Sequence, residues 1–198
     1  MDNIISPYSV RIMIERDVPA VTKLDREAFP NMEMPTNFER ELKNCLAHYI
    51  VACRDELSKP DNEWTADSDS IIGYAGLWVL VGEAHVVNIA VKQDYRGRGI
   101  GELLLISLFE MAIDARCNLI TLEVRSSNYI ARKLYEKYGF TVKGVRPGYY
   151  LNNREDAVIM TVNDIKGGNF EEWFKKLKRE YCKKWGLIRA GTAAPLSK

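Results

Sequence analysis

The sequence has few of the residues that build disulfide frameworks and metal centres. It contains four cysteines and two histidines in 198 residues, and no two cysteines form a C-x-x-C pair. We therefore expect neither structural disulfides nor a metal site. No apolar run is long enough to span a bilayer, and the first residues lack the basic and apolar regions of a secretory signal. These absences predict a cytoplasmic protein without a membrane partner.

The composition is that of a globular protein, but the charge is unevenly distributed. Apolar residues make up 46% and charged residues 28%, which suits one domain with an appendage. Residues 166–198 hold nine Lys or Arg and three Asp or Glu, although the net charge of the whole chain is +1. We expect a domain over 1–165 and a basic extension over 166–198.

The extension carries large apolar residues at helical spacing: Phe170, Trp173, Phe174, Leu177, Tyr181 and Trp185. This predicts an amphipathic helix of about 17 residues. The helix would dock on the body of the protein or on a partner. A membrane surface is an alternative suggested by the tryptophans and lysines, which we do not favour.

Hydrophobic periodicity predicts a mixed α/β sheet rather than a regular doubly wound fold. Strands are expected at 10–14, 48–54, 71–81, 85–91, 119–125, 141–146 and 156–162, and helices at 17–28, 36–46, 100–115 and 126–138. Asp17 would cap the first helix. Residues 55–70, with six acidic residues, read as a solvated loop that could attract a basic acceptor.

The most informative segment is the basic, glycine-rich turn at 96–101, Arg-Gly-Arg-Gly-Ile-Gly, between an apolar strand and a helix. Glycines let a ligand approach the backbone closely, and the N–H groups that begin a helix attract anions. A diphosphate is the expected occupant, with a plain structural turn as the alternative. The segment lacks the Gly-Lys-Ser/Thr of a P-loop, and its glycine spacing does not fit a dinucleotide fingerprint.

Three motifs together resemble the GNAT superfamily of acetyl-CoA-dependent N-acetyltransferases and, within it, the RimI branch. They are Asn88-Ile-Ala-Val with the turn that follows, Leu122-Glu-Val-Arg-x-Ser-Asn128, and Leu134-Tyr-x-x-Tyr-Gly-Phe140. Further matches at 146–150 and 155–160 extend the resemblance over about residues 9–163. The resemblance implies a central, mixed but mostly antiparallel sheet flanked by helices. It also implies acetyl transfer from acetyl-CoA to the N-terminal alanine of a small-subunit ribosomal protein, with no metal.

The resemblance assigns cofactor binding to the strand before the turn, to the turn itself and to one later residue. These are Ile89, Ala90, Val91, Arg96, Gly97, Arg98, Gly99, Ile100, Gly101, Glu102 and Asn128. The N–H near Val91 would polarise the thioester carbonyl. Asn128 could instead be a simple helix cap, and Arg96 and Arg98 could be ordinary solvated residues.

The same resemblance makes Glu123 the general base, acting through water, and Tyr135 the general acid. Strand alternation supports this, because Glu123 points away from the apolar set of its strand. The alternatives are that Glu123 pairs with Arg125 or another cation and that Tyr135 only packs. Phe29, Tyr149 and Tyr150 would contact the acceptor, unless the tyrosines are merely exposed loop aromatics. His48 and His85 read as core or strand residues.

The expected acceptor is a protein or peptide N-terminus, without direct contact to nucleic acid. An α-amine, with a pKa of about 7.7–8.0, is easier to deprotonate than lysine at about 10.4. Two other functions stay open at this point. One is acetylation of lysine side chains or small-molecule amines, and the other is a non-catalytic acyl-CoA-binding module.

Overall fold

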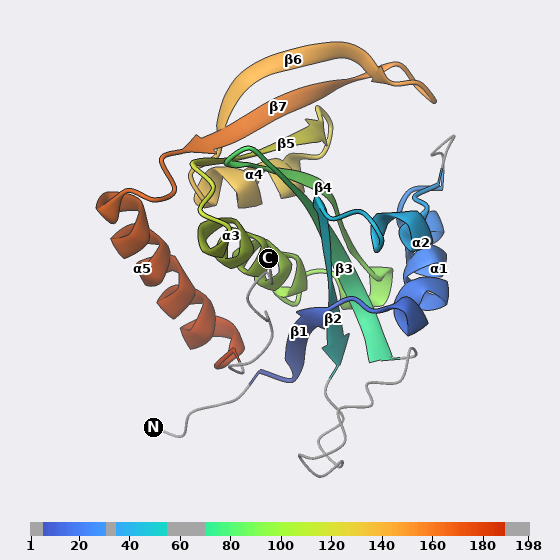
Figure 1. Cartoon of the computed structure of the whole chain (residues 1–198), viewed down its shortest axis with the longest axis horizontal. Coiled ribbons are helices and arrows are strands. Elements are labelled where there is room, and N and C mark those ends of the chain that lie inside the picture. Colours follow the sequence, from blue (N-terminus) through green and yellow to red (C-terminus); the bar gives the residue numbers. More distant parts are fainter. Residues whose placement is uncertain (1–5, 31–34, 55–69, 189–198) are drawn as a thin grey trace.

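The computed structural model describes residues 6–30, 35–54 and 70–188. The expected acidic loop therefore lies outside the described residues, apart from Ser70. Figure 1 shows one sheet, with helices on its two faces and a long helix, α5, at one side.

The sheet has seven strands in the order β1-β2-β3-β4-β5-β7-β6. Their bounds are β1 Tyr8–Ile12, β2 Ala47–Arg54, β3 Ile71–Leu80, β4 Glu83–Val91, β5 Leu119–Arg125, β6 Thr141–Tyr150 and β7 Glu155–Asn163. All neighbouring pairs are antiparallel except β4 and β5, which are parallel. The expected mixed, mostly antiparallel sheet is confirmed.

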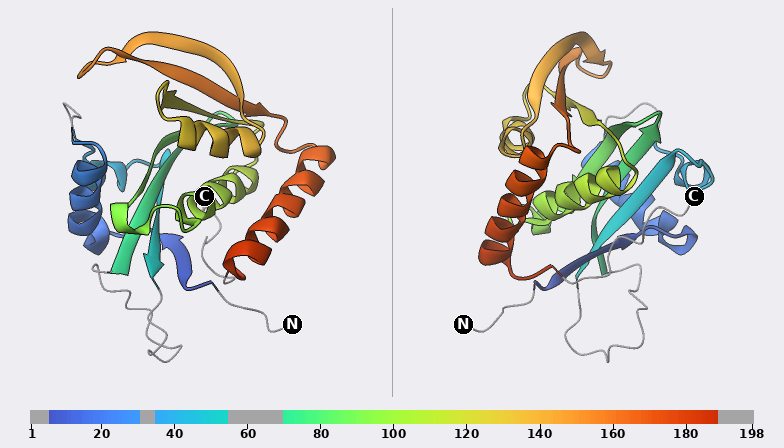
Figure 2. Two further views of the ribbon diagram at one scale, coloured as in Figure 1. Left: turned by 180° about the vertical axis from the view of Figure 1, so that it is seen from behind. Right: turned by 60° about the vertical axis from the view of Figure 1, so that its left-hand side comes forward.

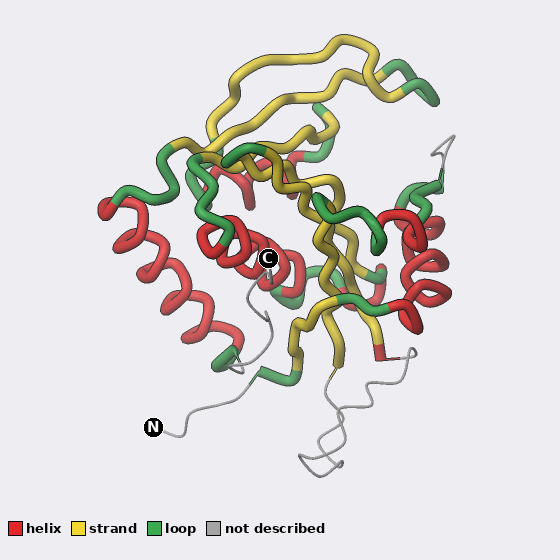
Figure 3. The backbone as a smooth tube through the Cα atoms, viewed as in Figure 1, coloured by secondary structure: helices red, strands yellow, loops and turns green. Residues whose placement is uncertain are grey.

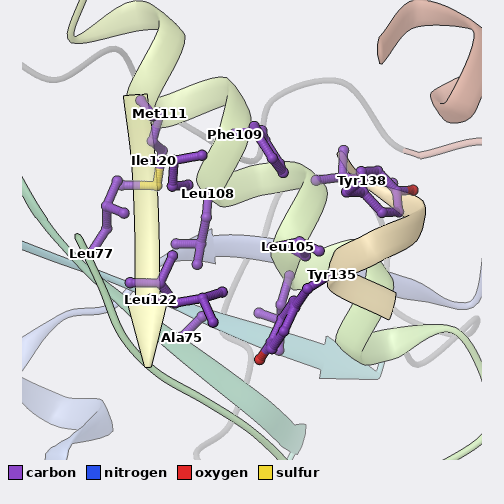
Figure 4. Packing of buried hydrophobic residues seen from close by; sticks show 14 of the residues in the cluster. Ala75, Leu77, Leu105, Leu108, Phe109, Met111, Ile120, Leu122, Tyr135 and Tyr138 are labelled. Carbon is purple, nitrogen blue, oxygen red and sulfur yellow. The ribbon is translucent and has the colours of Figure 1, made fainter. Parts of the chain in front are cut away.

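Helices cover both faces of the sheet because its strands alternate apolar side chains between two separate clusters. In β2, Ile50 faces one cluster and Val51 the other. The short α1 (Val18–Ala28) and α2 (Phe38–Glu41) pack on the side of Val51. The helices α3 (Ile100–Asp114) and α4 (Tyr129–Lys137) pack on the side of Ile50. Figure 4 shows α3, β5 and α4 meeting in this larger cluster.

Helix α5 (Gly168–Trp185), in the extension, packs on the outer side of α3 (Figure 2). Helix α3 therefore lies between the sheet and α5. The ring of Phe109 in α3 lies 5.5 Å from Phe170 and 5.3 Å from Phe174 of α5. Phe174, Leu177 and Tyr181 are buried in the same core as the sheet. Burial of an apolar side chain contributes about 1.5–3 kcal/mol. Of the two sites expected for the extension, the structure shows docking on the body.

Several local expectations differ from the structure. The second helix, expected over 36–46, covers only Phe38–Glu41. Strand β1 covers Tyr8–Ile12, two residues earlier than expected. Asp17 precedes α1, but its carboxylate accepts hydrogen bonds from Arg11 and from the N–H of Ile14 instead of capping the helix. Strand β6 continues past Arg146 to Tyr150, forming with β7 a long hairpin that reaches over one side of the molecule (Figure 3). Pro147 is tolerated there because β6 is an edge strand.

Within the described residues, none of the helices combines the length and apolarity needed to cross a membrane.

Candidate active site

Strands β4 and β5 separate partway along their length. Their parallel pairing runs from Glu83 opposite Leu119 to Val86 opposite Leu122 and then ends. At the same place the register of β4 on β3 shifts, which leaves Val87 as an extra residue in a β-bulge. A bulge bends the strand that carries it. The last residues of β4 therefore keep β3 as neighbour on one side, and within 6–30, 35–54 and 70–188 no strand pairs with them on the other.

The unpaired side of β4 presents backbone groups of Ile89 and Val91. The N–H of Lys92 donates to the carbonyl of Ile72, so it points to β3. Since successive residues of a strand alternate the direction of their N–H and C=O groups, those of Ile89 and Val91 point to the open side, and those of Ala90 point to β3. Arg96 Nε donates to the Val91 carbonyl at 3.2 Å, leaving the N–H of Val91 for a ligand.

The turn after β4, residues 96–102, is called the phosphate loop below. Gly97 and Gly99 have positive φ values of 76° and 79°. Helix α3 starts at Ile100, and its first intrahelical bond comes from Leu103, so the N–H groups of Ile100, Gly101 and Glu102 have no helical partner. These amides and the helix dipole together favour an anion.

Open space lies beside the phosphate loop. Among described atoms, a Cβ built on Gly97 would meet nothing within 4 Å, and one on Gly101 would meet only the Val91 side chain at 3.9 Å. The Arg98 guanidinium lies 5.2 Å from the centre of the Tyr95 ring. The Glu102 carboxylate accepts from Lys137 at 2.6 Å and from the Tyr138 hydroxyl at 2.8 Å. The loop thus offers its backbone, and the residues present fit a diphosphate.

Glu123 lies on the face of β5 opposite the apolar residues, as the alternation predicts. One carboxylate oxygen lies 2.5 Å from His85 Nε2, and the other lies 3.2 Å from Arg146 Nη2. The hydrogen bond with His85, helped by the charges of His85 and Arg146, lowers the pKa of Glu123 against the opposing effect of burial. Glu123 is therefore a carboxylate at neutral pH. Arg125, an alternative partner expected from the sequence, pairs with Glu155 instead of Glu123.

Tyr135 projects from α4, on the opposite face of the sheet from Glu123. Its ring packs against Phe140 at 5.6 Å and extends toward the sheet, with the hydroxyl at the far end (Figure 4). Burial raises the pKa of Tyr135, and the nearby Tyr150 raises it further. The phenol is therefore protonated at neutral pH. Burial also raises the pKa of Tyr150, with Tyr149 and Glu123 raising it further and Arg125 lowering it.

A network of side chains holds the end of the β6–β7 hairpin. The Arg125 guanidinium lies 3.8 Å from the centre of the Tyr150 ring and donates to Glu155 at 3.1 Å. Glu155 also accepts from the N–H of Ser127 at 2.8 Å, and its pKa is lowered to about 2. Tyr149 packs edge-on against Tyr150 at 5.2 Å. The Arg146 guanidinium, which lies 3.2 Å from Glu123, is also 5.6 Å from the centre of the Tyr149 ring, so Tyr149 is joined to Glu123 through Arg146.

Two further expected site residues, Phe29 and Asn128, lie on other elements than the residues described so far. Phe29 follows the end of α1 and packs on the cluster under α1 and α2, next to residues 31–34, which lie outside the described part. Asn128 is the N-cap of α4, where its Oδ1 accepts from the N–H of Ala131 at 3.2 Å. Its side-chain N–H groups are separate from that bond and are the part that a cofactor would use.

Sequence reasoning missed three residues of this region. His85 and Arg146 reach Glu123 from β4 and β6, and only the strand order and register bring them there. Asn88 is buried in β4, and its Oδ1 has no hydrogen-bond partner among the described residues. An asparagine within an apolar strand was the signal available for it. By contrast, His48 lies in β2, where burial lowers its pKa.

No cluster of three or more His, Cys, Asp or Glu side chains suited to a metal occurs in 6–30, 35–54 or 70–188.

Comparison with known proteins gives one consistent family. The sequence model described as "Acetyltransferase (GNAT) family" matches residues 18–140. A Bacillus subtilis protein provisionally named a ribosomal protein bS18-alanine N-acetyltransferase is 35% identical over 159 residues, which cover 79% of this chain and 97% of that protein.

Solved structures agree with this result. The ribosomal-protein-S18-alanine N-acetyltransferase from Escherichia coli superposes with a TM-score of 0.63 at 25% identity, covering 79% of this chain and 94% of that one. NAA60 from Arabidopsis thaliana, crystallised with acetyl-CoA, superposes with a TM-score of 0.68 at 19% identity, covering 81% and 99%. The latter likeness concerns the fold alone.

Proposed function

The chain belongs to the GNAT family of acetyltransferases, and we propose that it acetylates the α-amine of a protein N-terminus, with the N-terminal alanine of a small-subunit ribosomal protein as acceptor. Membership makes it an acetyl-CoA-dependent N-acetyltransferase. The acceptor is supported by the names of the Bacillus subtilis and Escherichia coli relatives. Such an acceptor implies a cytoplasmic enzyme. Residues 1–165 would form the catalytic domain and 166–198 its extension.

The open side of β4 and the phosphate loop would hold acetyl-CoA. Ile89 and Val91 offer backbone groups at a strand edge without a strand partner, which suits the amide groups of a pantetheine arm. The N–H groups of Ile100, Gly101 and Glu102 would bind the diphosphate. Bound there, the cofactor supplies an acetyl thioester, whose carbonyl the N–H of Val91 would polarise.

The observation that carries this proposal is the Glu123 carboxylate, held by His85 and Arg146 where β4 and β5 separate. A peptide α-ammonium has a pKa of about 7.7–8.0, so a minor change in its surroundings yields the neutral nucleophile. Glu123 attracts the ammonium group and accepts its proton through a water molecule. His85 and Arg146 keep the carboxylate ionised and fix its orientation.

Tyr135 would complete the transfer from the other side of the sheet. When the amine attacks the thioester carbonyl, the carbon–sulfur bond breaks and a thiolate leaves. A phenol kept protonated by burial can donate its proton to that sulfur. The separation of β4 from β5 lets groups on the two faces of the sheet act on one bond. Tyr149, Tyr150 and Phe29 are proposed to contact the acceptor.

Mass spectrometry of matched peptides tests the acceptor class. One peptide has a free N-terminal alanine, and its counterpart is blocked at the α-amine and contains a lysine. Incubated with acetyl-CoA and the protein, the first should gain one acetyl group and the second none. Acetylation of the blocked peptide alone would move the function to lysine side chains. If both peptides and a panel of small amines stay unmodified although acetyl-CoA binds, the protein is a non-catalytic binding module.

A further inference from the structure

The last helix, α5, runs along α3 and ends at the phosphate loop. Phe170 and Phe174, near the start of α5, contact Phe109 in the second half of α3. An ion pair between Lys178 and Glu110 follows. Trp185, the last residue of α5, lies against Gly99 at the start of α3. The extension therefore connects the core of the protein to the proposed cofactor site.

The contact between Trp185 and Gly99 is close. A Cβ built on Gly99 would lie 2.7 Å from Cε2 of the indole and 2.8 Å from Cδ2 and Nε1. The indole thus occupies the space in which any other residue would place its side chain. Gly97 and Gly101 are different, because open space adjoins both of them. The phosphate loop therefore has one glycine supported from behind by protein and two glycines beside space for a ligand.

Gly99 is the residue whose conformation directs the following amides. It has a φ of 79° and forms the N-cap of α3, immediately before the unpaired N–H groups of Ile100, Gly101 and Glu102. A glycine samples more backbone conformations than any other residue, so fixing it opposes ligand binding by a loss of entropy. A rigid ring placed against Gly99 removes many of these conformations before the ligand arrives.

Contacts at the end of α5 hold the indole in this place. Gly186 has a φ of 94° and closes the helix with a bond from its N–H to the Cys182 carbonyl at 3.0 Å. The Leu187 carbonyl accepts from the N–H of Ser6 at 3.1 Å, which ties the end of α5 to the start of β1. Trp185 Nε1 is buried and has no hydrogen-bond partner in the described part of the chain. Packing and the Lys184 ammonium, which lies 4.8 Å from the centre of the ring, therefore orient the indole without a hydrogen bond.

We propose that Trp185 is a positioning residue that holds the phosphate loop in its cofactor-binding conformation, so that the extension 166–198 strengthens acetyl-CoA binding without touching the reacting atoms. This inference rests on the proposed function, since it assumes that the loop binds the diphosphate.

Calorimetric titration of the full chain with CoA tests the proposal without catalysis. In Trp185→Ala the phosphate loop should lose its pre-organisation, so the Kd for CoA should rise about tenfold. At saturating acetyl-CoA, kcat should stay within about twofold of the wild-type value. KM for acetyl-CoA should rise with Kd. Hydrogen exchange of the amides in 96–102 should become faster in the free variant. Trp185→Phe keeps a flat ring without the unpaired N–H, and it should bind CoA as the wild type does.

The matched control is Trp173→Ala, at the other tryptophan of α5. Trp173 lies near the start of α5, whereas Trp185 ends the helix. The Trp173 indole lies against Gly139, where a built Cβ would be 3.0 Å from it. It should lower thermal stability but leave the Kd of CoA unchanged. Equal loss of affinity in both variants would overturn the proposal, because the effect would then be general destabilisation. Trp185→Leu is measured in parallel with Trp185→Ala, and wild-type CoA affinity in whichever of these two variants folds would also overturn the proposal.

Gly101→Leu separates this inference from the proposed function. Its side chain would enter the open space beside the phosphate loop and should abolish CoA binding. If Gly101→Leu binds CoA like the wild type, the loop assignment itself fails. If Gly101→Leu loses binding and Trp185→Ala does not, the loop assignment stands and the role of Trp185 fails.

Discussion

The phosphate loop and the β6–β7 hairpin lie on two sides of the place where β4 and β5 separate, and they present different parts of the polypeptide. The loop presents backbone N–H groups at the start of a helix whose other residues are almost all buried. The hairpin presents side chains, among them Arg146, Tyr149 and Tyr150, on a strand that is mostly exposed. A backbone site suits a ligand common to a whole family, whereas a side-chain site can change with the acceptor. The first three predictions below test the reaction beside this place, and the fourth tests the stability of the hairpin.

The largest effect is expected at Glu123, which belongs to the acceptor side. Glu123→Gln keeps the shape but removes the proton acceptor, so kcat should fall by about 10²–10⁴-fold. The Kd of CoA, measured by calorimetry, should stay at the wild-type value. A variant with normal kcat would remove Glu123 from the mechanism, and one with weak CoA binding would break the division between the two sides.

Tyr135→Phe should lower kcat by about 10²-fold, because the thiolate would leave without a proton donor. The change removes only a hydroxyl from a ring that packs against Phe140, so the fold should be retained. Pre-steady-state kinetics with an acetyl thioester of a more acidic thiol provides the check. A better leaving group needs less protonation, so the variant should recover much of its rate; no recovery would favour a packing role.

Arg146→Gln should have a smaller effect that is confined to the acceptor side. Its partner Glu123 would lose one cation, and the pKa of Glu123 would rise toward its ordinary value. A partly exposed ion pair contributes about 0.2–1 kcal/mol, so KM for the peptide should rise by about fivefold at most. Lys143→Gln is the matched control, with the same charge change on the same strand. Equal effects of both variants would indicate general charge attraction instead of the specific pair.

The smallest effect concerns stability in acid. Glu155 has a folded-state pKa of about 2 against an ordinary value of 4.5, so its stabilising bonds are complete above about pH 4.5. They are lost as the pH falls from there toward 2. Urea unfolding at pH 7, 4 and 3 should show a steeper loss for the wild type than for Glu155→Gln. Parallel curves would show that the hairpin network adds no stability of its own.

The sequence predicted those features that depend on neighbours along the chain. Alternation in β5 placed Glu123 opposite the apolar residues, and the bounds of β5 are as expected. The glycine-rich turn between β4 and α3 was expected where it lies, because its glycines and the helix that follows are contiguous. The partners of Glu123 were not predicted, because His85 and Arg146 lie on β4 and β6 and meet it only through strand order.

The position of α5 could have been predicted from the apolar residues of α3. In α3, Leu105, Ile106 and Phe109 are buried in addition to Leu103, Leu104 and Leu108, so the helix is buried on more than one side. A helix that is apolar all round needs a second covering layer. Combined with the aromatic spacing of 166–198, this would have predicted that α5 covers α3. The contact of Trp185 with Gly99 could not follow from pattern, because it depends on where the helix ends in space.

The outer edge of the sheet has a consequence for solubility. Strand β6 has ten residues and a partner on only one side, and Val142 and Val145 are half exposed along it. Such edges can pair with a second chain and start aggregation. Lys143, Arg146 and Pro147 interrupt this edge with charge and with a missing N–H, which are means by which natural sheets prevent such pairing. Arg146 therefore has a place both beside the carboxylate of Glu123 and in keeping the enzyme dispersed at high concentration.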